Sequence, residues 1–111
     1  KKLQKQKMNI ENKKTLIQEY TIDRVLKIHG EKEQEKVFKY KVCFYSKGKS
    51  IICEMHRIIN DQAESKPYAV GVANCHEEDT FDPTTGGIIA EARALKQLYT
   101  KNLRDIIADQ Y

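Results

Sequence analysis

The sequence lacks tryptophan and has only two prolines and three cysteines among its 111 residues. The odd number of cysteines, with no CxxC pair, argues against a secreted disulfide scaffold and favours reduced, partly buried thiols. The longest uninterrupted apolar run, residues 69–73, is far too short to cross a bilayer, and nothing resembles a secretory leader. We therefore expect a cytoplasmic protein.

Charge is distributed unevenly along the chain. Residues 1–50 contain 14 Lys and Arg against 6 Asp and Glu, whereas residues 51–111 contain 6 against 10, and the formal net charge is +4. The basic half could attract phosphates or nucleic acid, although lysine-rich stretches are more often solvated surface. The length fits one domain, residues 1–111. We expect residues 1–8 to be flexible, or to consist of foreign residues that precede an original start at Met8.

Hydrophobic periodicity predicts a two-layer α+β fold, in which an antiparallel sheet of three to four strands is packed by a long C-terminal helix. Alternation is clearest from Phe38 to Phe44, and Gly48 in the polar turn that follows favours a hairpin. Helical spacing of apolar residues predicts a short N-terminal helix over residues 9–20. The predicted strands span residues 22–28, 38–44, 51–58 and 68–75, with polar connections at 31–36, 46–49 and 60–66.

The last predicted strand and the C-terminal helix are expected to pack on each other. One face of the strand carries only small residues, Ala69, Gly71, Ala73 and Cys75, and can accept a close helix. The helix has an apolar series three or four residues apart, which we expect to face the sheet: Ile88, Ala92, Leu95, Tyr99, Leu103 and Ile106. Two helix starts are open, Asp82 before Pro83 or Thr85 before the glycines, and so is a break near residues 100–102.

The polar loop at residues 79–87, between this strand and the helix, is the strongest candidate for a binding site. The first N–H groups of a helix are unpaired, and its dipole favours negative charge there. The hydroxyls of Thr84 and Thr85 and the N–H groups of Gly86 and Gly87 could therefore hold a phosphate. The pattern is neither a Walker loop nor a Rossmann fingerprint. The alternative is that the glycines let the helix lie close to the strand, and both roles can hold.

Other residues extend this candidate site toward a nucleotide. Arg93, Arg104 and Arg57 are candidate phosphate ligands, because a guanidinium fork matches two oxygens at once. A salt-bridged edge position is the alternative for Arg57. Phe81 could stack on a base or pin the loop to the core. Asn74, near the end of the last strand, completes the predicted ligand-binding set.

The sequence predicts neither a catalytic site nor a metal site. The acidic residues at 77–82 beside His76 are explained more simply by the helix dipole and by solubility than by acid–base chemistry. No Ser, Cys or Lys stands out as an activated nucleophile. Cys75 and His76 are adjacent on a strand, so their side chains point to opposite faces and cannot easily share a metal ion. We predict a protein that is not an enzyme and that carries no cofactor.

Residues 71–82 follow the pattern G-V-A-x-C-x-x-x-D-x-F-D, and the helix then reads G-x-x-I-A-x-A-R-A as far as Ala94. This stretch resembles small bacteriophage and prophage proteins. Such proteins look like the double-stranded-RNA-binding domain, in which helices back an antiparallel sheet. True RNA-binding members open their second helix with a lysine-rich cluster, whereas this helix opens with Thr-Thr-Gly-Gly, which argues against binding of duplex RNA.

Among phage proteins of this size, the chain resembles the Thoeris anti-defence family. These non-catalytic proteins sequester cyclic ADP-ribose-type and cyclic oligonucleotide immune signals in pockets between subunits. The resemblance implies a homo-oligomer in the bacterial host cell that binds a small cyclic nucleotide, with Arg93 or Arg104 completing the site of a neighbouring subunit. Two alternatives are open: a nucleic-acid binder that uses the lysine-rich half, and a protein-interaction module that inhibits a host defence enzyme.

Overall fold

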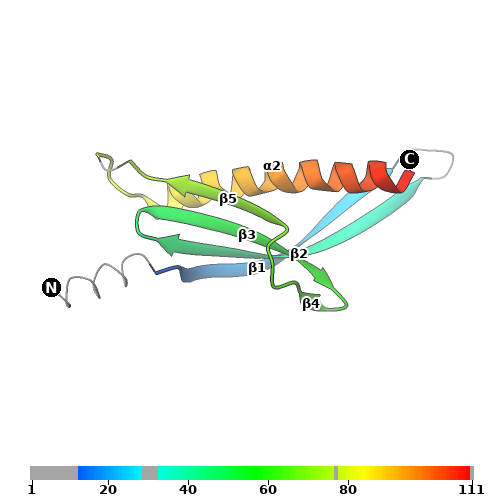
Figure 1. Cartoon of the computed structure of the whole chain (residues 1–111), viewed down its shortest axis with the longest axis horizontal. Helices are drawn as coiled ribbons and strands as arrows, with labels where there is room; N and C mark the ends of the chain where they lie inside the picture. Colours follow the sequence, from blue (N-terminus) through cyan, green and yellow to red (C-terminus); the bar gives the residue numbers. More distant parts are fainter. Residues whose placement is uncertain (1–12, 29–32, 77, 111) are drawn as a thin grey trace.

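The computed structural model describes residues 13–28, 33–76 and 78–110. Its elements are β1 (Thr15–Ile28), β2 (Gln34–Lys47), β3 (Ser50–Ile59), β4 (Gln62–Ala63), β5 (Ala69–Asn74) and α2 (Pro83–Gln110). The strands form one antiparallel sheet in the order β1-β2-β3-β5, and the two-residue β4 pairs with the end of β3. The helix α2 runs along this sheet (Figure 1). The predicted α+β fold, with an antiparallel sheet and a long C-terminal helix, is confirmed.

The N-terminal part of the prediction is wrong where the structure describes it. Residues 1–12 lie outside the described residues, but from Thr15 onward the chain is a β-strand and not a helix. The register of β1 against β2 shifts between Leu16 and Gln18, which marks a β-bulge. A bulge inserts one extra residue and so interrupts the alternation of apolar and polar positions. This interruption made a strand look helical in the sequence.

The charged connection predicted at residues 31–36 is shorter than expected. Gln34, Glu35 and Lys36 belong to β2 and pair with the last residues of β1. Charged residues are tolerated there because both strands of this hairpin reach into solvent, where polar side chains protect a sheet from aggregation. We call the hairpin of residues 20–28 and 34–40 the β1–β2 arm.

Two tight turns fix the register of the central strands. The predicted hairpin turn between β2 and β3 is confirmed, and Gly48 has a positive φ of 58°. The polar connection after β3 contains a second turn, in which Asn60 and Asp61 have φ values of 53° and 63°. Asn and Asp accept this left-handed conformation better than most residues, so a two-residue turn leads into β4.

The predicted close packing of the C-terminal helix on β5 is confirmed. Ala69, Ala73, Ala90 and Ala94 are all buried. A Cβ atom added to Gly71 would lie 2.0 Å from the Ala90 carbonyl oxygen and 2.4 Å from the Ala94 nitrogen. The backbones of β5 and α2 therefore approach so closely that only glycine fits at this point.

The side of α2 that faces the sheet is not the predicted one. The helix is continuous, without a break at residues 100–102, and its buried residues are Ala90, Ala94, Leu98 and Asn102. In the predicted series, Leu95 is partly buried and packs against the core, but Ile88 is 67%, Tyr99 53% and Leu103 39% exposed. Close contact with the small-residue strand selects alanines, and this rotates the larger apolar residues away from β5.

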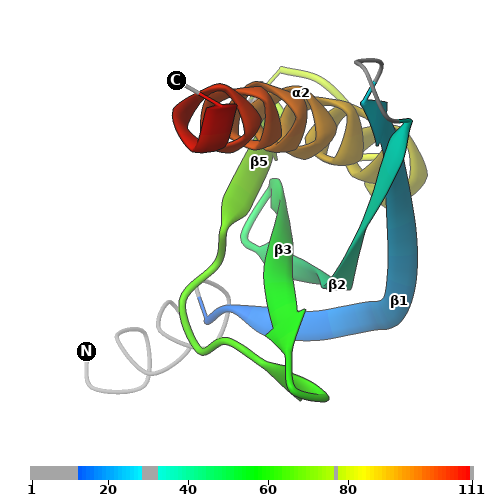
Figure 2. The ribbon, with the colours of Figure 1, turned by 90° about the vertical axis from the view of Figure 1, so that its right-hand side faces the viewer.

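The sheet curls, and α2 packs against one half of it. The helix contacts β5 and β3 extensively, whereas β1 and β2 bend away and form the side wall seen in Figure 2. Two buried or half-buried hydrogen bonds bridge the two sides: Tyr20 Oη donates to Glu91 Oε2 at 3.1 Å, and Tyr40 Oη donates to Asn102 Oδ1 at 2.9 Å. The concave side of β1 and β2 therefore faces the flank of α2 that carries Glu91 and Asn102.

Candidate functional site

A pocket of about 350 Å³ lies at the end of the molecule where the loop between β5 and α2 meets the turn between β2 and β3. We call it the loop pocket. It contains four of the predicted ligand-binding residues, namely Asn74, Phe81, Thr85 and Gly86. The other lining residues are Lys49, Ala73, Cys75, His76, Asp79, Thr80, Asp82 and Ile89. Its walls thus combine an aromatic ring, aliphatic groups, an amide and two carboxylates.

The helix start beside this pocket is already occupied by a carboxylate of the same chain. Asp82 Oδ1 accepts a hydrogen bond from the Thr84 N–H at 3.0 Å, and Oδ2 accepts one from the Thr85 hydroxyl at 2.7 Å. These bonds, first that from the Thr85 hydroxyl and then that from the Thr84 N–H, hold the pKa of Asp82 below its ordinary value. Of the two start sites left open by the sequence, the structure uses Asp82 as the N-cap and Pro83 as the first helical residue.

The idea of free N–H groups at the two glycines is therefore incorrect. The Gly86 N–H donates to the Asp82 carbonyl oxygen at 2.9 Å. Gly87 is the fifth residue of α2, beyond the four N–H groups that a helix leaves unpaired. A phosphate at this helix start would have to displace the Asp82 carboxylate.

The predicted packing role is confirmed for Gly86 but not for Gly87, and the strand that Gly86 approaches is β3 and not β5. A Cβ atom added to Gly86 would lie 2.9 Å from Ile51 Cγ1, so this glycine lets α2 approach β3. Gly87 has no described atom within 4 Å of such a Cβ. The residue that allows the closest approach of helix and strand is Gly71, on β5.

Hydrogen bonds hold the polar wall of the loop pocket in place. Ser50 Oγ donates to Asn74 Oδ1 at 2.5 Å, which orients the Asn74 amide. The Cys75 N–H donates to the Lys49 carbonyl oxygen at 2.9 Å and ties the loop to the β2–β3 turn. Phe81 is partly buried and packs against the hydrophobic core while lining the pocket. Its ring thus pins the loop and also presents an aromatic surface to the pocket.

Two of the predicted arginines lie on the outer flank of α2, away from the loop pocket. Arg93 and Arg104 line a separate hollow of about 360 Å³. Arg93, Gln97 and Lys101 bond backbone groups of β5 and of the residue before it. Arg93 Nη1 donates to the Val72 carbonyl oxygen at 2.6 Å, the Val70 N–H donates to Gln97 Oε1 at 2.7 Å, and Lys101 Nζ donates to the Tyr68 carbonyl oxygen at 2.6 Å. Side chains four residues apart on one helix therefore cover the open edge of the sheet, where another strand would otherwise pair.

The remaining predicted residues are also separated from the loop pocket. Arg57 Nε donates to Glu64 Oε1, and its guanidinium lies 4.8 Å from the centre of the Tyr68 ring, which matches the salt-bridged alternative. Thr84 and Gly87 line a hollow on the β1 side of α2. The structure thus brings together four of the nine predicted residues and distributes the others over three hollows.

Sequence reasoning missed Lys49 and Ile89 as pocket residues. The antiparallel register of β3 and β5 pairs Ser50 with Asn74 and so places the β2–β3 turn beside the loop. Periodicity predicted both strands, and the missing information was which strands are neighbours. Ile89 points to the pocket because the true sheet-facing side of α2 is rotated from the predicted one.

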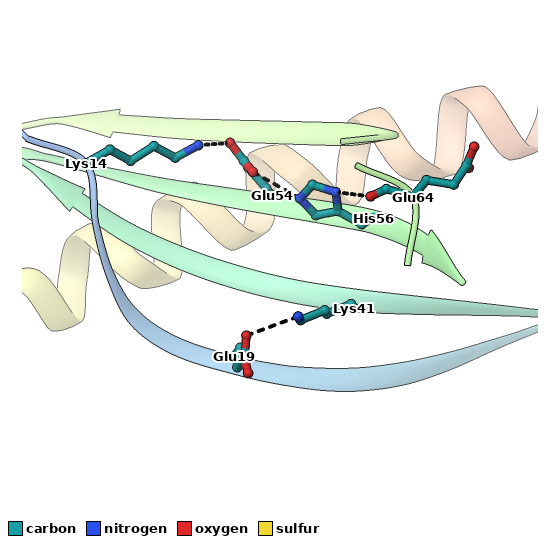
Figure 3. A network of polar contacts seen from close by, with 6 residues as sticks. All are labelled: Lys14, Glu19, Lys41, Glu54, His56 and Glu64. Carbon is teal, nitrogen blue, oxygen red and sulfur yellow. Dashed lines mark hydrogen bonds and ion pairs between the residues drawn. The ribbon is translucent and has the colours of Figure 1, made fainter. Parts of the chain in front are cut away.

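A second polar cluster lies on the convex face of the sheet (Figure 3). Lys14 Nζ bonds Glu54 Oε2, Glu54 Oε1 lies 3.0 Å from His56 Nε2, and His56 Nδ1 donates to the Glu64 carbonyl oxygen at 2.7 Å. Burial raises the pKa of Glu54, but the hydrogen bonds from Lys14 and His56 outweigh this effect and the pKa is lowered. The chain of contacts links the segment before β1, the strand β3 and the segment after β4. We interpret it as structural.

No protein-family model matches this chain, and neither a curated protein nor a solved structure shows significant similarity to it. In the part of the chain that the structure describes, no helical segment has both the length and the hydrophobicity of a membrane span. The described residues also include no group of three His, Cys, Asp or Glu side chains arranged to hold a metal ion.

Proposed function

We propose that this chain is a non-catalytic protein that binds a small nucleotide in the loop pocket, and that it acts as a phage anti-defence protein by sequestering a cyclic nucleotide immune signal in the host cytoplasm. The observation that supports binding is the joint placement of Phe81, Asn74 and the two carboxylates in one pocket. The anti-defence role and the cyclic nature of the ligand rest on the sequence resemblance.

The pocket suits a nucleoside better than a phosphate. Phe81 and Ile89 supply apolar surface for a base, and the oriented Asn74 amide can recognise its edge. Asp79 and Asp82 can accept hydrogen bonds from ribose hydroxyls, as acidic residues do in dinucleotide sites. The volume of about 350 Å³ lies in the range of small-ligand sites.

Side chains around the loop pocket, and not the N–H groups of the helix start, would contact the phosphates. Lys49 and His76 are exposed and line the same pocket. Arg93 and Arg104 lie on the outer flank of α2 and would reach this pocket only from a neighbouring subunit. The helix dipole contributes less than the sequence suggests, because the Asp82 carboxylate already interacts with it.

The position of the one cysteine in the pocket supports binding without turnover. Cys75 Sγ lies 3.4 Å from the His76 carbonyl oxygen and 3.6 Å from the Asp79 carbonyl oxygen. A cysteine acts as a nucleophile when a base takes its proton, whereas the described contacts of the Cys75 thiol are with backbone carbonyl oxygens.

One observation favours nucleic-acid binding as a second candidate. Four cations line the hollow on the outer flank of α2, and no described lining residue is acidic: Arg93, Lys96, Lys101 and Arg104. Such a cluster can contact phosphates, and the affinity would then fall steeply with added salt. A nucleotide in the loop pocket would depend much less on salt.

The test is a thermal-shift screen with mononucleotides, dinucleotides and cyclic nucleotides, followed by calorimetric titration. A ligand at about 100 times its Kd stabilises the folded state by about 2.7 kcal/mol, so a true ligand raises the melting temperature measurably. Phe81→Leu keeps an apolar side chain but removes the stacking ring, and we expect it to weaken binding by roughly 5-fold to 150-fold. Phe38→Leu, the same change on the β1–β2 arm, serves as the control.

Two results would contradict the proposal. One is a panel in which no nucleotide raises the melting temperature. The other is a bound nucleotide whose affinity is the same in Phe81→Leu and in the wild type, because the ligand would then occupy another site.

A further inference from the structure

Another hollow lies at the start of α2, on a different face of the helix from the loop pocket. It has a volume of about 390 Å³, which is in the range of small-ligand sites, and it is bounded by β1 and α2. None of its lining residues lines the loop pocket. Because Glu91 is part of its wall, we call it the Glu91 hollow.

Most of the wall of this hollow is aliphatic or aromatic. Its apolar and aromatic lining residues are Ile17, Tyr20, Phe44, Ile51, Pro83 and Ile88. The ring centres of Tyr20 and Phe44 are 6.0 Å apart, with an angle of 30° between the ring planes. Phe44 and Ile51 are buried, whereas Ile17 and Ile88 are 51% and 67% exposed. A ligand with an apolar body would therefore cover aliphatic surface that water now contacts.

Glu91 is the one charged side chain among the described residues that line the hollow. Tyr20 Oη donates a hydrogen bond to Glu91 Oε2 at 3.1 Å. The ion pairs formed between described residues do not include Glu91. A carboxylate can accept about four hydrogen bonds, so this half-buried group can accept more from a ligand.

The negative charge of Glu91 is felt across the wall of the hollow. Burial, and after it the charge of Glu91, raises the pKa of Tyr20 to about 12. The same two causes, in the same order, raise the pKa of the buried Cys53 thiol to about 12. A second negative charge is thus disfavoured at both groups. By the same Coulomb interaction, a positive charge placed in the hollow is favoured.

We infer that the Glu91 hollow binds a small organic cation, namely a protonated amine attached to an aromatic or aliphatic body. The ammonium group donates to the Glu91 carboxylate, and the side-chain oxygens of Gln18 and Thr84 on the same wall can accept further hydrogen bonds. The body packs against Tyr20 and Phe44, whose ring faces also attract a cation.

The position of Glu91 on the helix is compatible with a bound cation. It is the ninth residue of α2, beyond the first turn in which the helix dipole opposes positive charge. An anion such as a nucleotide phosphate would be repelled by this carboxylate. The inference therefore concerns a different ligand and does not rest on the proposed nucleotide site.

The experiment titrates the full chain at neutral pH with three probes that share a phenyl body: phenethylamine, phenethyl alcohol and hydrocinnamate. Their polar groups are cationic, neutral and anionic. Calorimetry measures the affinities, and amide NMR shifts locate the site. We expect the amine to bind at least about 10-fold more tightly than the alcohol, and the anion more weakly than either. The amide signals of Gln18 and Gly87 should shift with the amine, whereas those of Asn74 and Asp79 should not.

Three variants test the role of the carboxylate. Glu91→Gln removes the charge but keeps an oxygen that can accept the Tyr20 hydrogen bond, so we expect a folded protein that binds the amine at least about 10-fold more weakly. Glu19→Gln is the matched control on β1, because Glu19 pairs with Lys41 and does not line the hollow. It should bind the amine as the wild type does. Ile88→Lys, at an exposed position three residues before Glu91, supplies an ammonium group from the chain itself and should also weaken binding.

Several results would overturn the inference. The first is an amine that does not bind at millimolar concentrations, or that binds no more tightly than the alcohol. Another is a folded Glu91→Gln or Ile88→Lys variant with the amine affinity of the wild type. Equal losses in Glu91→Gln and Glu19→Gln would also contradict it, because net charge and not the hollow would then attract the amine. NMR shifts confined to the loop pocket would contradict the location.

Discussion

Gly71→Ala is the substitution for which the structure makes the sharpest prediction. The new Cβ atom would lie 2.0 Å from the Ala90 carbonyl oxygen, whereas ordinary contact begins at 3.4 Å, so about 1.4 Å is missing. The Ala94 nitrogen, at 2.4 Å, is also too close. Both obstacles are helix backbone, which cannot rotate away as a side chain can. The helix α2 must therefore lift from β5.

The cost follows from the contacts that are lost when α2 lifts. Ala90, Ala94 and Leu98 are fully buried against the sheet, and a gap of even 1 Å forfeits up to half of the dispersion energy of each contact. Overpacking typically costs 1–3 kcal/mol, and we expect about 3 kcal/mol here because the backbone cannot yield. This loss corresponds to a melting temperature lower by roughly 12 °C, or a urea midpoint lower by about 2 M.

The same substitution at the other glycines provides the controls. Gly87→Ala, with no described atom within 4 Å, should stabilise the helix by about 0.5–1 kcal/mol. Gly86→Ala, which meets only the Ile51 side chain at 2.9 Å, should fall between the two. Urea unfolding at one fixed protein concentration measures all three variants. A Gly71→Ala protein within about 0.5 kcal/mol of the wild type would refute the close approach of β5 and α2.

Two further predictions concern hydrogen bonds. Tyr40→Phe removes the buried hydrogen bond to Asn102 and should lower the free energy of unfolding by about 1–3 kcal/mol. An additional Asn102→Leu change should recover part of this loss, because no buried amide is then left without a partner. If the losses of the two single variants simply add in the double variant, the hydrogen bond is contradicted. A carboxyl whose pKa is lowered by folding stabilises the protein above its unfolded pKa, and this contribution is lost as the pH falls through the folded value. The Glu54→Gln variant should therefore lose less stability than the wild type when the pH falls below 4.5, as measured by urea unfolding at a series of pH values. Glu19→Gln, which changes an exposed ion pair, is the control and should alter the pH profile less. Equal pH profiles of the two variants would show that Glu54 does not contribute to the acid sensitivity of the fold.

The strands were predictable from the sequence because one of their faces is buried. Tyr40, Val42 and Phe44 alternate with more polar residues, and the turn at Gly48 needs a residue that accepts a positive φ. The bulge near Leu16 was not predictable, because an inserted residue imitates helical spacing over a short segment. The charged start of β2 was missed because its strand character comes from pairing with β1 and not from burial.

The candidate site, like the fold, could be predicted from the sequence only in part. The loop between β5 and α2 was identified correctly as a place where polar and aromatic residues meet, and Asn74, Phe81 and Thr85 line one pocket there. The binding of a phosphate was inferred from the helix start, with its unpaired N–H groups, its glycines and its threonine hydroxyls. The Asp82 side chain fills that position, since an N-cap and an anion compete for the same donors. Sequence spacing does not reveal which of the two is present.

The error in the orientation of α2 has a physical cause. Hydrophobic spacing identifies apolar residues on a helix but not which neighbour they face. Here the closest neighbour is β5, whose small face admits the backbone of Ala90 and Ala94, so the alanine side of α2 turns to the sheet. The larger residues that an isolated helix would bury, such as Ile88 and Tyr99, are then left exposed. Hydrophobic spacing alone cannot distinguish these two outcomes, because it does not include the shape of the surface against which the helix packs.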